Sequence, residues 1–380
     1  MKVLYDYQAF SMQRFGGVSN SFIQLIKYLP EEVKYEISLR ESDNVHIVES
    51  GITKVIPAKC VEDNFISTTK FKGRGFLYRQ WYKLFPSTTS IGRNKQYSIE
   101  ALIKGDYNVF HPTFFDDYFL PYLNGKPFVL TVHDMIPELF FKKPDIQIKT
   151  KPRLCKKAAQ IIAVSEKTKS DLIDILKVPE KKVTVIYHGV PENVNILDTS
   201  PIVEGKYILY VGQRGLYKCF NQMLTQLGPV LNRHPELKIV CTGLPFTKKE
   251  MALMAHLGVK DRMVQLNPSD KELMNLYAHA LCFIYPSIYE GFGIPILEAY
   301  KYQCPVLLNY KSCFPEIAQD AAIYFHLDDN QSDLEQVMEG FLAMSERERN
   351  ELIERQNIRL KFFSWETSAK KMAEVYYNVL

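Results

Sequence analysis

The chain has 380 residues, more than one ordinary hydrophobic core contains, so two domains of about 150–200 residues each are expected. Its composition, with 46% hydrophobic and 24% charged residues, excludes a disordered or fibrous chain and fits a globular protein. The net charge of +4 is too small to indicate nucleic acid binding, and we expect no nucleic acid partner.

The cysteines and the apolar runs indicate a soluble protein of a reducing compartment. Seven cysteines occur without any CxxC pair, so reduced, buried thiols are expected, and no Cys/His spacing indicates a zinc site. The opening segment does not fit a signal peptide because Asp6 interrupts its apolar residues. No run approaches the roughly 20 apolar residues that span a bilayer. We therefore expect a cytoplasmic protein, either soluble or resting at the inner face of a membrane.

Short apolar, β-rich runs alternate with helical patterns along the whole chain. In the first half these runs are KVLYDY, YNVFHP, PFVLTVHD, QIIAVS and VTVIYHG; in the second half they are YILYVG, LKIVCTG, MVQLN, LCFIYPS, PVLLN and AIYF. Continuous apolar strands that alternate with helices predict parallel sheets covered on both faces. Because the pattern occurs twice, the predicted fold is α/β, with two Rossmann-like, doubly wound domains facing a central cleft.

The boundary between the domains is predicted from composition. Residues 190–206 are rich in Pro, Asn, Asp, Ser and Gly and lack helical periodicity. We expect a first domain at 1–195, a second at 196–362 and a final helix within 363–380. Ligands of open α/β sheets bind beyond the carboxyl ends of the strands, so the loops that follow the strands are the candidate sites.

Two loops of the first half carry candidate residues. Gly16 and Gly17, in RFGGVSNSF, permit a positive φ and bring backbone N–H groups close to a ligand, and the helix start behind them suits phosphate. A tight strand-to-helix turn explains these glycines equally well. His133, in TVHDMIP, ends a strand, where it either contacts a sugar hydroxyl and takes part in proton transfer or is a hydrogen-bonded structural histidine.

The loop YVGQRGLYKCF places Arg214 and Lys218 where a strand gives way to a helix. Cations at a helix start oppose the helix dipole unless an anion lies between them. A planar guanidinium and an ammonium together suit a phosphate group. The alternative is a solvated basic turn, and we favour the anion site.

The segment SIYEGFGIPILEAYKY contains two glutamates in different settings. Glu290 precedes a glycine-rich turn, and the backbone N–H groups of Phe292, Gly293 and Ile294 are expected to point at a ligand. Glu298 lies among apolar helical positions, where an unpaired carboxylate costs several kcal/mol. Such a carboxylate requires strong donors, which ribose or sugar hydroxyls or an internal arginine would supply.

The spacing of these glutamates in PSIYEGFGIPILEA resembles the E-x7-E signature of the retaining glycosyltransferases of family 4, which have the GT-B fold. Further segments follow in the family's order: GGVSNSF, VHD, VSEKTKSDL, HGV, VGQRGLYK, ELMNLYAHALCFIYPS, CPVL and PEIAQDAAIYF. The resemblance covers nearly the whole chain. It implies transfer of a sugar from a nucleotide-diphosphate sugar to a hydroxyl of a glycan or glycolipid, in the synthesis of a surface polysaccharide.

The resemblance also implies a role for each domain and each candidate residue. The first domain binds the acceptor, a glycan or lipid-linked glycan; the second binds the nucleotide-sugar donor; and the final helix packs back on the first domain. The catalytic candidates are His133 and Glu290. The remaining candidates are Gly16, Gly17, Arg214, Lys218, Phe292, Gly293, Ile294 and Glu298 for the donor and its phosphates, and Gly243, Leu266 and Asn267 for the base.

The reaction is expected to need no metal and no cofactor. Arg214 and Lys218 supply the positive charge that many sugar transferases take from a metal, and the adjacent Asp116 and Asp117 of FFDDYF do not form a spaced DxD pair. No nucleophilic carboxylate for a double displacement stands out, so the leaving phosphate is the candidate base, as the family implies. The spacing of Arg214 and Lys218 is closest to that of a subgroup often using GDP-mannose, which we favour as the donor. The chain departs from the family at Gln303, where a glycine is usual.

Residues 70–85, KFKGRGFLYRQWYKLF, interleave five cations with aromatic residues. The segment either rests on an anionic membrane surface or forms a basic amphipathic helix packed by its aromatic face, and we favour the second interpretation. The oligomeric state is not predicted.

Two other functions fit the same pattern. One is a nucleotide-sugar epimerase, and the other is a protein that binds nucleotide sugars without catalysis. The E-x7-E pattern favours transfer over isomerisation. The pattern disfavours an NAD dehydrogenase, because GxGxxG with a downstream acidic residue is missing.

Overall fold

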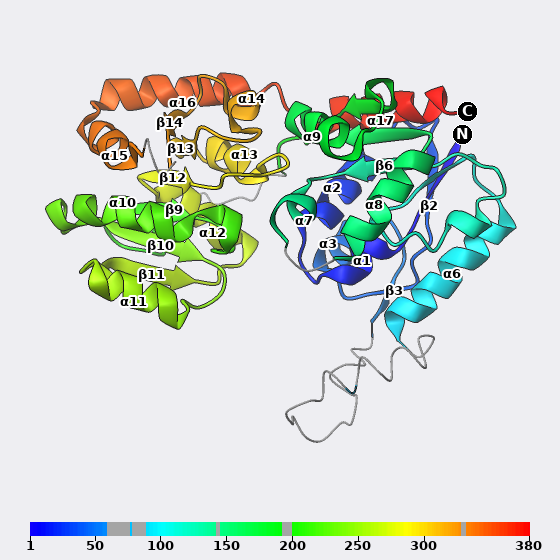
Figure 1. Ribbon diagram of the computed structural model, residues 1–380, viewed down its shortest axis with the longest axis horizontal. Helices are drawn as coiled ribbons and strands as arrows, with labels where there is room; N and C mark the ends of the chain where they lie inside the picture. Colours follow the sequence, from blue (N-terminus) through cyan, green and yellow to red (C-terminus); the bar gives the residue numbers. More distant parts are fainter. Residues whose placement is uncertain (59–76, 78–88, 142–144, 192–199, 328–331) are drawn as a thin grey trace. The chain divides into compact units, whose positions relative to one another are not determined.

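A computed structural model describes residues 1–58, 77, 89–141, 145–191, 200–327 and 332–380 (Figure 1). The chain divides into two compact units. Unit 1 comprises Met1–Val164, Thr168–Tyr187 and Trp365–Leu380, and unit 2 comprises Ser165–Lys167 and His188–Ser364. Each unit is an α/β fold built on parallel strands.

The described residues of unit 1 form two three-stranded parallel sheets and one small two-stranded sheet. The orders are β2-β1-β5, β6-β7-β8 and β3-β4, and a parallel bridge between Phe110 and Phe128 connects the first sheet to the segment leading into β6. The strands are β1 (Lys2–Tyr5), β2 (Lys34–Ile37), β3 (Glu41–Ser42), β4 (Ile56–Pro57), β5 (Val109–His111), β6 (Val129–Val132), β7 (Gln160–Ala163) and β8 (Val183–Val185).

The helices of unit 1 include the last helix of the chain, α17. They are α1 (Gln8–Met12), α2 (Gly17–Lys27), α3 (Val45–Ser50), α6 (Ser90–Lys104), α7 (Ile136–Phe140), α8 (Ile146–Lys157), most of α9 (Glu166–Leu176) and α17 (Trp365–Asn378). The hydroxyl of Tyr376 on α17 lies 2.7 Å from the Tyr5 hydroxyl and 2.6 Å from His111 Nδ1, and all three side chains are buried. Helix α17 is therefore tied to the middle of the β2-β1-β5 sheet.

Unit 2 is built on one six-stranded parallel sheet with the order β11-β10-β9-β12-β13-β14. Its strands are β9 (Tyr207–Tyr210), β10 (Lys238–Thr242), β11 (Met263–Leu266), β12 (Cys282–Tyr285), β13 (Val306–Asn309) and β14 (Ile323–Phe325). The first strand of the unit lies in the centre and the chain runs outward on both sides, which is the doubly wound strand order of dinucleotide-binding folds.

Helices cover both faces of the unit 2 sheet because successive strand residues are buried on opposite sides. Ile208 and Tyr210 of β9 join the core formed with α10 and α15, whereas Tyr207 points to the other face, where its hydroxyl donates to the carbonyl of Leu276 on α12. The helices are α10 (Phe220–Arg233), α11 (Lys248–His256), α12 (Asp270–His279), α13 (Ile294–Lys301), α14 (Phe314–Ala318), α15 (Leu334–Ala343) and α16 (Glu346–Leu360).

The predicted fold class of two doubly wound α/β domains is confirmed. Each apolar run quoted above contains a strand. The strands that the sequence pattern missed are β2, β3 and β4. Strand β2 lies at a sheet edge and buries only Ile37 fully, so it lacks the continuous apolar run of a central strand.

The predicted thiols are confirmed for the six described cysteines, which are buried and free of disulfides; Cys60 lies outside the described residues. The segment 70–85 also lies outside them, apart from Leu77.

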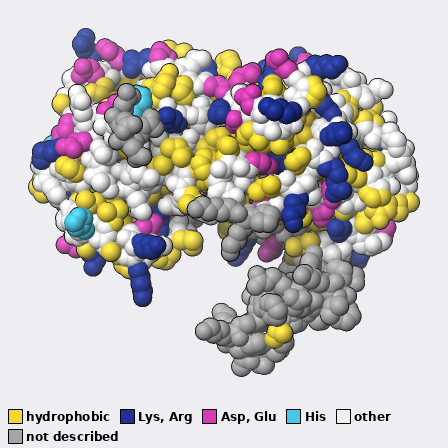
Figure 2. Space-filling model, in the orientation of Figure 1, with side chains coloured by type: hydrophobic (Ala, Val, Ile, Leu, Met, Phe, Trp, Pro, Cys, Tyr) yellow, Lys and Arg dark blue, Asp and Glu magenta, His cyan; other side chains and the backbone are white. Residues whose placement is uncertain are grey.

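In the part of the chain that the structure describes, no helix combines the length and apolarity that crossing a bilayer requires. Acidic and basic side chains are interspersed on the face drawn in Figure 2, in keeping with the small net charge.

Candidate functional site

The strand order of unit 2 points to one place for a ligand. Strands β10 and β11 lie on one side of β9, and β12, β13 and β14 lie on the other, so the chain reverses its direction of winding between β9 and β12. Ligands of open parallel sheets bind beyond the carboxyl ends of the strands at this switch point. The loops that meet there are residues 211–219 and 286–293.

The loop after β9 makes two sharp turns before α10 begins. Gly212 has a φ of +115°, which favours glycine, and Cys219, directly before the helix, has a φ of +49°. A single 3-10 turn, Leu216–Lys218, lies between them and ends with Lys218 at the start of α10.

The loop after β12 turns into α13 at Gly293, whose φ is +91°. The positive φ favours glycine, and a Cβ atom there would in addition lie 3.1 Å from Cδ1 of Ile296, which is a tight contact. The Phe292 ring is buried and packs edge-on against His188 (4.9 Å between centroids) and Phe363 (5.7 Å). These contacts fix the start of α13, where Ile294 is the first helical residue.

Lys218 and Glu290 meet at the switch point, although they are far apart in the sequence. The Nζ atom of Lys218 lies 2.5 Å from Oε1 of Glu290, and the two side chains are 14% and 10% exposed. The ammonium also lies 5.2 Å from the ring centre of Tyr217 and 5.4 Å from that of Tyr285. Burial, and then the carboxylate of Glu290, raise the pKa of the Tyr285 phenol. The sequence predicted both charged residues as site residues, and the structure brings them together.

The backbone of Glu290 is held by Ser312 and Cys313, which the sequence analysis did not single out. The hydroxyl of Ser312 accepts from the N–H of Glu290 at 3.1 Å and donates to its carbonyl at 2.8 Å. The Cys313 thiol lies 3.3 Å from the same carbonyl and 3.2 Å from that of Phe292. Ser312 has a φ of +56°, which is unusual for a residue with a side chain. No periodicity or glycine marks Ser312 in the sequence.

Glu298 lies one turn into α13 and is half-buried. The hydroxyl of Tyr277 on α12 donates to its Oε2 at 3.0 Å. Burial raises the pKa of Glu298 to about 7, and the hydrogen bond from Tyr277 opposes this rise. The predicted need of this carboxylate for a donor is therefore met in part by a tyrosine that precedes β12 in the chain. The sequence pattern predicted hydroxyls of a ligand or an internal arginine as donors and did not indicate Tyr277.

Among the described residues, no hydrogen bond or ion pair joins Arg214 to the Lys218–Glu290 pair. Its Nε donates to Oε1 of Glu250 at 2.9 Å, its Nη1 donates to the Thr242 carbonyl at 3.4 Å, and its Nη2 donates to the carbonyls of Leu244 and Pro245. Its side chain is only 5% exposed. The guanidinium is thus directed at the loop that follows β10.

The residues predicted for the base lie along the ends of β10 and β11. Gly243 has a φ of +98°, its N–H donates to the Leu266 carbonyl at 2.9 Å, and a Cβ atom on it would lie 3.4 Å from the Gly212 carbonyl oxygen. Leu266 is half-buried, and Asn267 is exposed. Gly243 therefore adjoins the loop after β9.

Unit 1 contains the other candidates. Gly16 is the N-cap of α2, and its φ of −166° is extended backbone, so it does not use the positive φ that a glycine permits. His133 directly follows β6 and packs edge-on against Phe22 at 5.9 Å. Burial and the positive charge of Lys151 lower the pKa of His133 to about 4, so the ring is neutral at pH 7.

The adjacent aspartates of FFDDYF are both engaged in ion pairs, Asp116 with Lys95 at 3.0 Å and Asp117 with Arg153.

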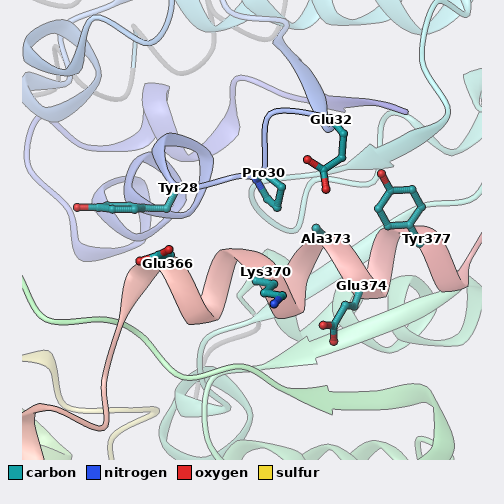
Figure 3. Close-up of a pocket in the computed structure, with 8 residues that line it drawn as sticks. All are labelled: Tyr28, Pro30, Glu32, Glu366, Lys370, Ala373, Glu374 and Tyr377. Carbon is teal, nitrogen blue, oxygen red and sulfur yellow. The ribbon is translucent and has the colours of Figure 1, made fainter.

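A separate cavity of about 390 Å³ lies in unit 1 between α17 and the turn after α2 (Figure 3). Glu366, Lys370 and Glu374 line it from α17, and none of the candidate residues takes part.

Two sequence families match consecutive parts of the chain. The family described as "Glycosyltransferase Family 4" matches residues 15–194, and the family described as "Glycosyl transferases group 1" matches residues 196–358. These matches cover most of both units and include all the candidate residues.

Similar proteins include several mannosyltransferases. The O-antigen chain mannosyltransferase RfbU of Salmonella typhimurium is 29% identical over 56% of this chain and 60% of its own length. The O-antigen chain mannosyltransferase B of Escherichia coli is 25% identical over 68% of this chain and 72% of its own. The GDP-mannose:cellobiosyl-diphosphopolyprenol alpha-mannosyltransferase of Xanthomonas oryzae is 28% identical over 48% and 51%. The match thus spans less than two thirds of the length of two of these relatives.

Solved structures with the same fold include HepE of Anabaena in complex with UDP and glucose, with a TM-score of 0.72 and 16% identity over the full length of both chains. WaaG, a glycosyltransferase involved in lipopolysaccharide biosynthesis, gives a TM-score of 0.64 with 15% identity over 99% of each chain. At these identities the likeness concerns the fold. The likeness shows the GT-B fold, and the two family matches show that the chain belongs to glycosyltransferase family 4.

Proposed function

We propose that this glycosyltransferase moves mannose from GDP-mannose to a hydroxyl of a glycan or lipid-linked glycan, with retention of the anomeric configuration, in the assembly of a surface polysaccharide. The observation that carries the proposal is the Lys218–Glu290 pair at the switch point of unit 2, with a Nζ–Oε1 distance of 2.5 Å. The mannosyltransferases among the similar proteins support the choice of sugar, and the Xanthomonas protein, which is named for GDP-mannose, supports the choice of nucleotide.

Lys218 is suited to the diphosphate of such a donor. An ammonium has three N–H donors, of which Glu290 engages one, so Lys218 can bind a phosphate oxygen without releasing Glu290. Cleavage of the sugar–phosphate bond leaves additional negative charge on the diphosphate. A cation held in place before the reaction stabilises that charge without reorganisation.

Glu290 is suited to the transferred sugar. Its carboxylate is anchored on one side by Lys218, and its backbone is fixed by Ser312, so the second carboxylate oxygen has a defined position for a sugar hydroxyl. The N–H groups at the start of α13, including that of Ile294, favour a negatively polarised ligand through the helix dipole. We assign Glu298, one turn later, to the ribose hydroxyls, with Tyr277 orienting it.

His133 is the candidate for contact with the sugar near the reacting carbon. Its low pKa, about 4, makes it a neutral hydrogen-bonding group rather than a proton donor at pH 7. A ring with so low a pKa is also a weak base, so we assign the proton of the incoming hydroxyl to an oxygen of the leaving phosphate. We also propose that no metal is required, because Lys218 supplies positive charge at the phosphate.

The test uses the purified chain with GDP-mannose, UDP-glucose and other nucleotide sugars. Transfer to a polyprenyl-diphosphate-linked glycan is followed by release of the nucleoside diphosphate and by NMR of the anomeric proton in the product. We expect GDP-mannose to be used, an α-linked product, and unchanged activity in EDTA. An inverted product, strict Mg²⁺ dependence, or a new sugar isomer formed without acceptor would each contradict the corresponding part of the proposal.

A further inference from the structure

Arg214 was predicted as a phosphate ligand, yet its guanidinium is occupied by protein atoms. Four of its five N–H groups donate to oxygens of Glu250, Thr242, Leu244 and Pro245. Its charged group lies 4.8 Å from the ring centre of Phe246. With its planar face against an aromatic ring and one N–H group remaining, Arg214 retains little capacity for a phosphate.

The partner carboxylate is bound as completely as Arg214. Glu250 accepts from Arg214 through Oε1 at 2.9 Å and from the N–H of Thr247 through Oε2 at 2.6 Å, and Thr247 in turn caps α11 through the N–H of Glu250. Its side chain is 8% exposed. Burial works against ionisation, but the hydrogen bonds from Thr247 and Arg214 outweigh it and lower the pKa of Glu250. The charge of Arg214 is therefore neutralised within unit 2.

These contacts fall on one short segment, residues 243–247, which connects β10 to α11. Arg214 binds two of its carbonyl groups and packs on Phe246, and Glu250 binds its last N–H group. The segment starts at Gly243, beside the Gly212 carbonyl of the loop after β9. Its position is therefore set by a side chain from the loop that also carries Lys218.

We propose that Arg214 is a positioning residue which, together with Glu250, clamps residues 243–247 so that they form the surface against which the base of the nucleotide donor rests. Of the two cations predicted to bind the diphosphate, only Lys218 then does so. This inference rests on the proposed function for the existence of a nucleotide ligand, but the clamp itself is a property of the ligand-free protein.

The experiment compares three variants, Arg214→Met, Glu250→Gln and Lys218→Met, with Arg347→Met as a control, because Arg347 is 83% exposed on α16. Hydrogen exchange of the ligand-free proteins measures the protection of residues 244–247 through the backbone N–H groups of Leu244, Phe246 and Thr247. Calorimetric or NMR titration measures the affinity for GDP and for guanosine, with UDP and uridine in parallel.

We expect Arg214→Met and Glu250→Gln to increase hydrogen exchange in residues 244–247. Both variants should also weaken the binding of the nucleoside and of the nucleoside diphosphate by the same factor, about tenfold. Since the two residues act as one unit, the double variant should be no weaker than the worse single variant. Lys218→Met should weaken the binding of GDP at least tenfold and leave both the affinity for guanosine and the hydrogen-exchange pattern unchanged.

A different pattern would overturn the proposal. If Arg214→Met weakens GDP binding but changes neither guanosine binding nor hydrogen exchange, Arg214 is a phosphate ligand and the proposed clamping role is wrong. If no nucleotide binds the wild type, the proposed function fails, and exchange in the ligand-free variants still decides whether Arg214 and Glu250 hold the segment.

Discussion

The two units have the same topology around their first strand but use the equivalent crevice differently. In unit 1 β1 lies between β2 and β5, and in unit 2 β9 lies between β10 and β12. Beyond β9 and β12, Lys218 and Glu290 form a partly exposed ion pair. Beyond β1 and β5, the carboxyl group of Asp6 is fully buried and accepts hydrogen bonds from Thr113, Gln8 and the Tyr118 hydroxyl.

The difference begins with the residue that follows the first strand. Asp6 comes directly after β1 and binds the N–H and hydroxyl of Thr113 at 2.8 and 2.7 Å, so it joins the two loops to each other. At the corresponding place in unit 2 the apolar Val211 and Gly212 follow β9, and the charged groups arrive later in each loop. A shared fold therefore gives the location of a crevice. The side chains that follow the strands decide whether protein groups occupy that crevice or a ligand can bind in it.

The largest expected effect comes from breaking the unit 2 pair. Lys218→Met and Glu290→Gln should each lower the rate of mannosyl transfer by about 100- to 1000-fold, because each removes a preorganised charge at the reacting groups. Initial rates of GDP release measure this. Circular dichroism and thermal unfolding should show an intact fold.

A matched control for that experiment is Lys238→Met. Lys238 also lies in unit 2, at the start of β10, where its ammonium donates to the Glu204 carbonyl at 3.0 Å. Turnover near the wild-type level in Lys218→Met or Glu290→Gln would mean that the pair is not the reacting site.

The second prediction breaks the equivalent position of unit 1. Asp6→Ala removes the common acceptor of several buried donors, each of which costs about 1–3 kcal/mol when unsatisfied. We expect a fall of several kcal/mol in the stability of unit 1, measured by urea unfolding, without a change in the affinity for GDP. A variant that binds GDP weakly yet unfolds like the wild type would assign Asp6 to a ligand and remove the contrast between the units.

The third prediction concerns the pH dependence of donor binding. The pKa of Glu298 is raised to about 7, so the carboxylate that would accept ribose hydroxyl bonds forms as the pH rises through 7. Affinity for GDP should increase about tenfold from pH 6 to pH 8, which is the change in ionised fraction for that pKa. Titration calorimetry at several pH values measures it, and Glu298→Gln should flatten the profile. A flat wild-type profile would contradict the role of Glu298.

The smallest effect is expected at Tyr277. Its hydrogen bond to Glu298 lowers the pKa of that carboxyl, so Tyr277→Phe should move the midpoint of the pH profile to higher pH and weaken GDP several-fold at pH 7. At pH 9 the affinity should approach that of the wild type. A loss that is the same at every pH would indicate a packing role for Tyr277 instead.

Much of the architecture could be predicted because buried parallel strands are long apolar runs, and turns such as Gly212 and Gly293 need glycine for a stated reason. The half-exposed strand β2 has no such run. Charged residues in loops bounded by glycines could be predicted as candidate site residues, but the residues that they contact could not be predicted. Glu250 has the pattern of an ordinary capping box, and its bond to Arg214 arises only when β9 and β10 lie side by side. Ser312 and Tyr277 likewise reach the glutamates through tertiary packing.

The most direct measurement is a crystal structure of the chain soaked with GDP-mannose. We expect the diphosphate beyond the carboxyl ends of β9 and β12, with an oxygen within hydrogen-bond distance of Lys218 Nζ, the mannose beside Glu290 and the ribose at Glu298. A donor bound elsewhere, with the Lys218–Glu290 pair free of ligand, would contradict the central claim.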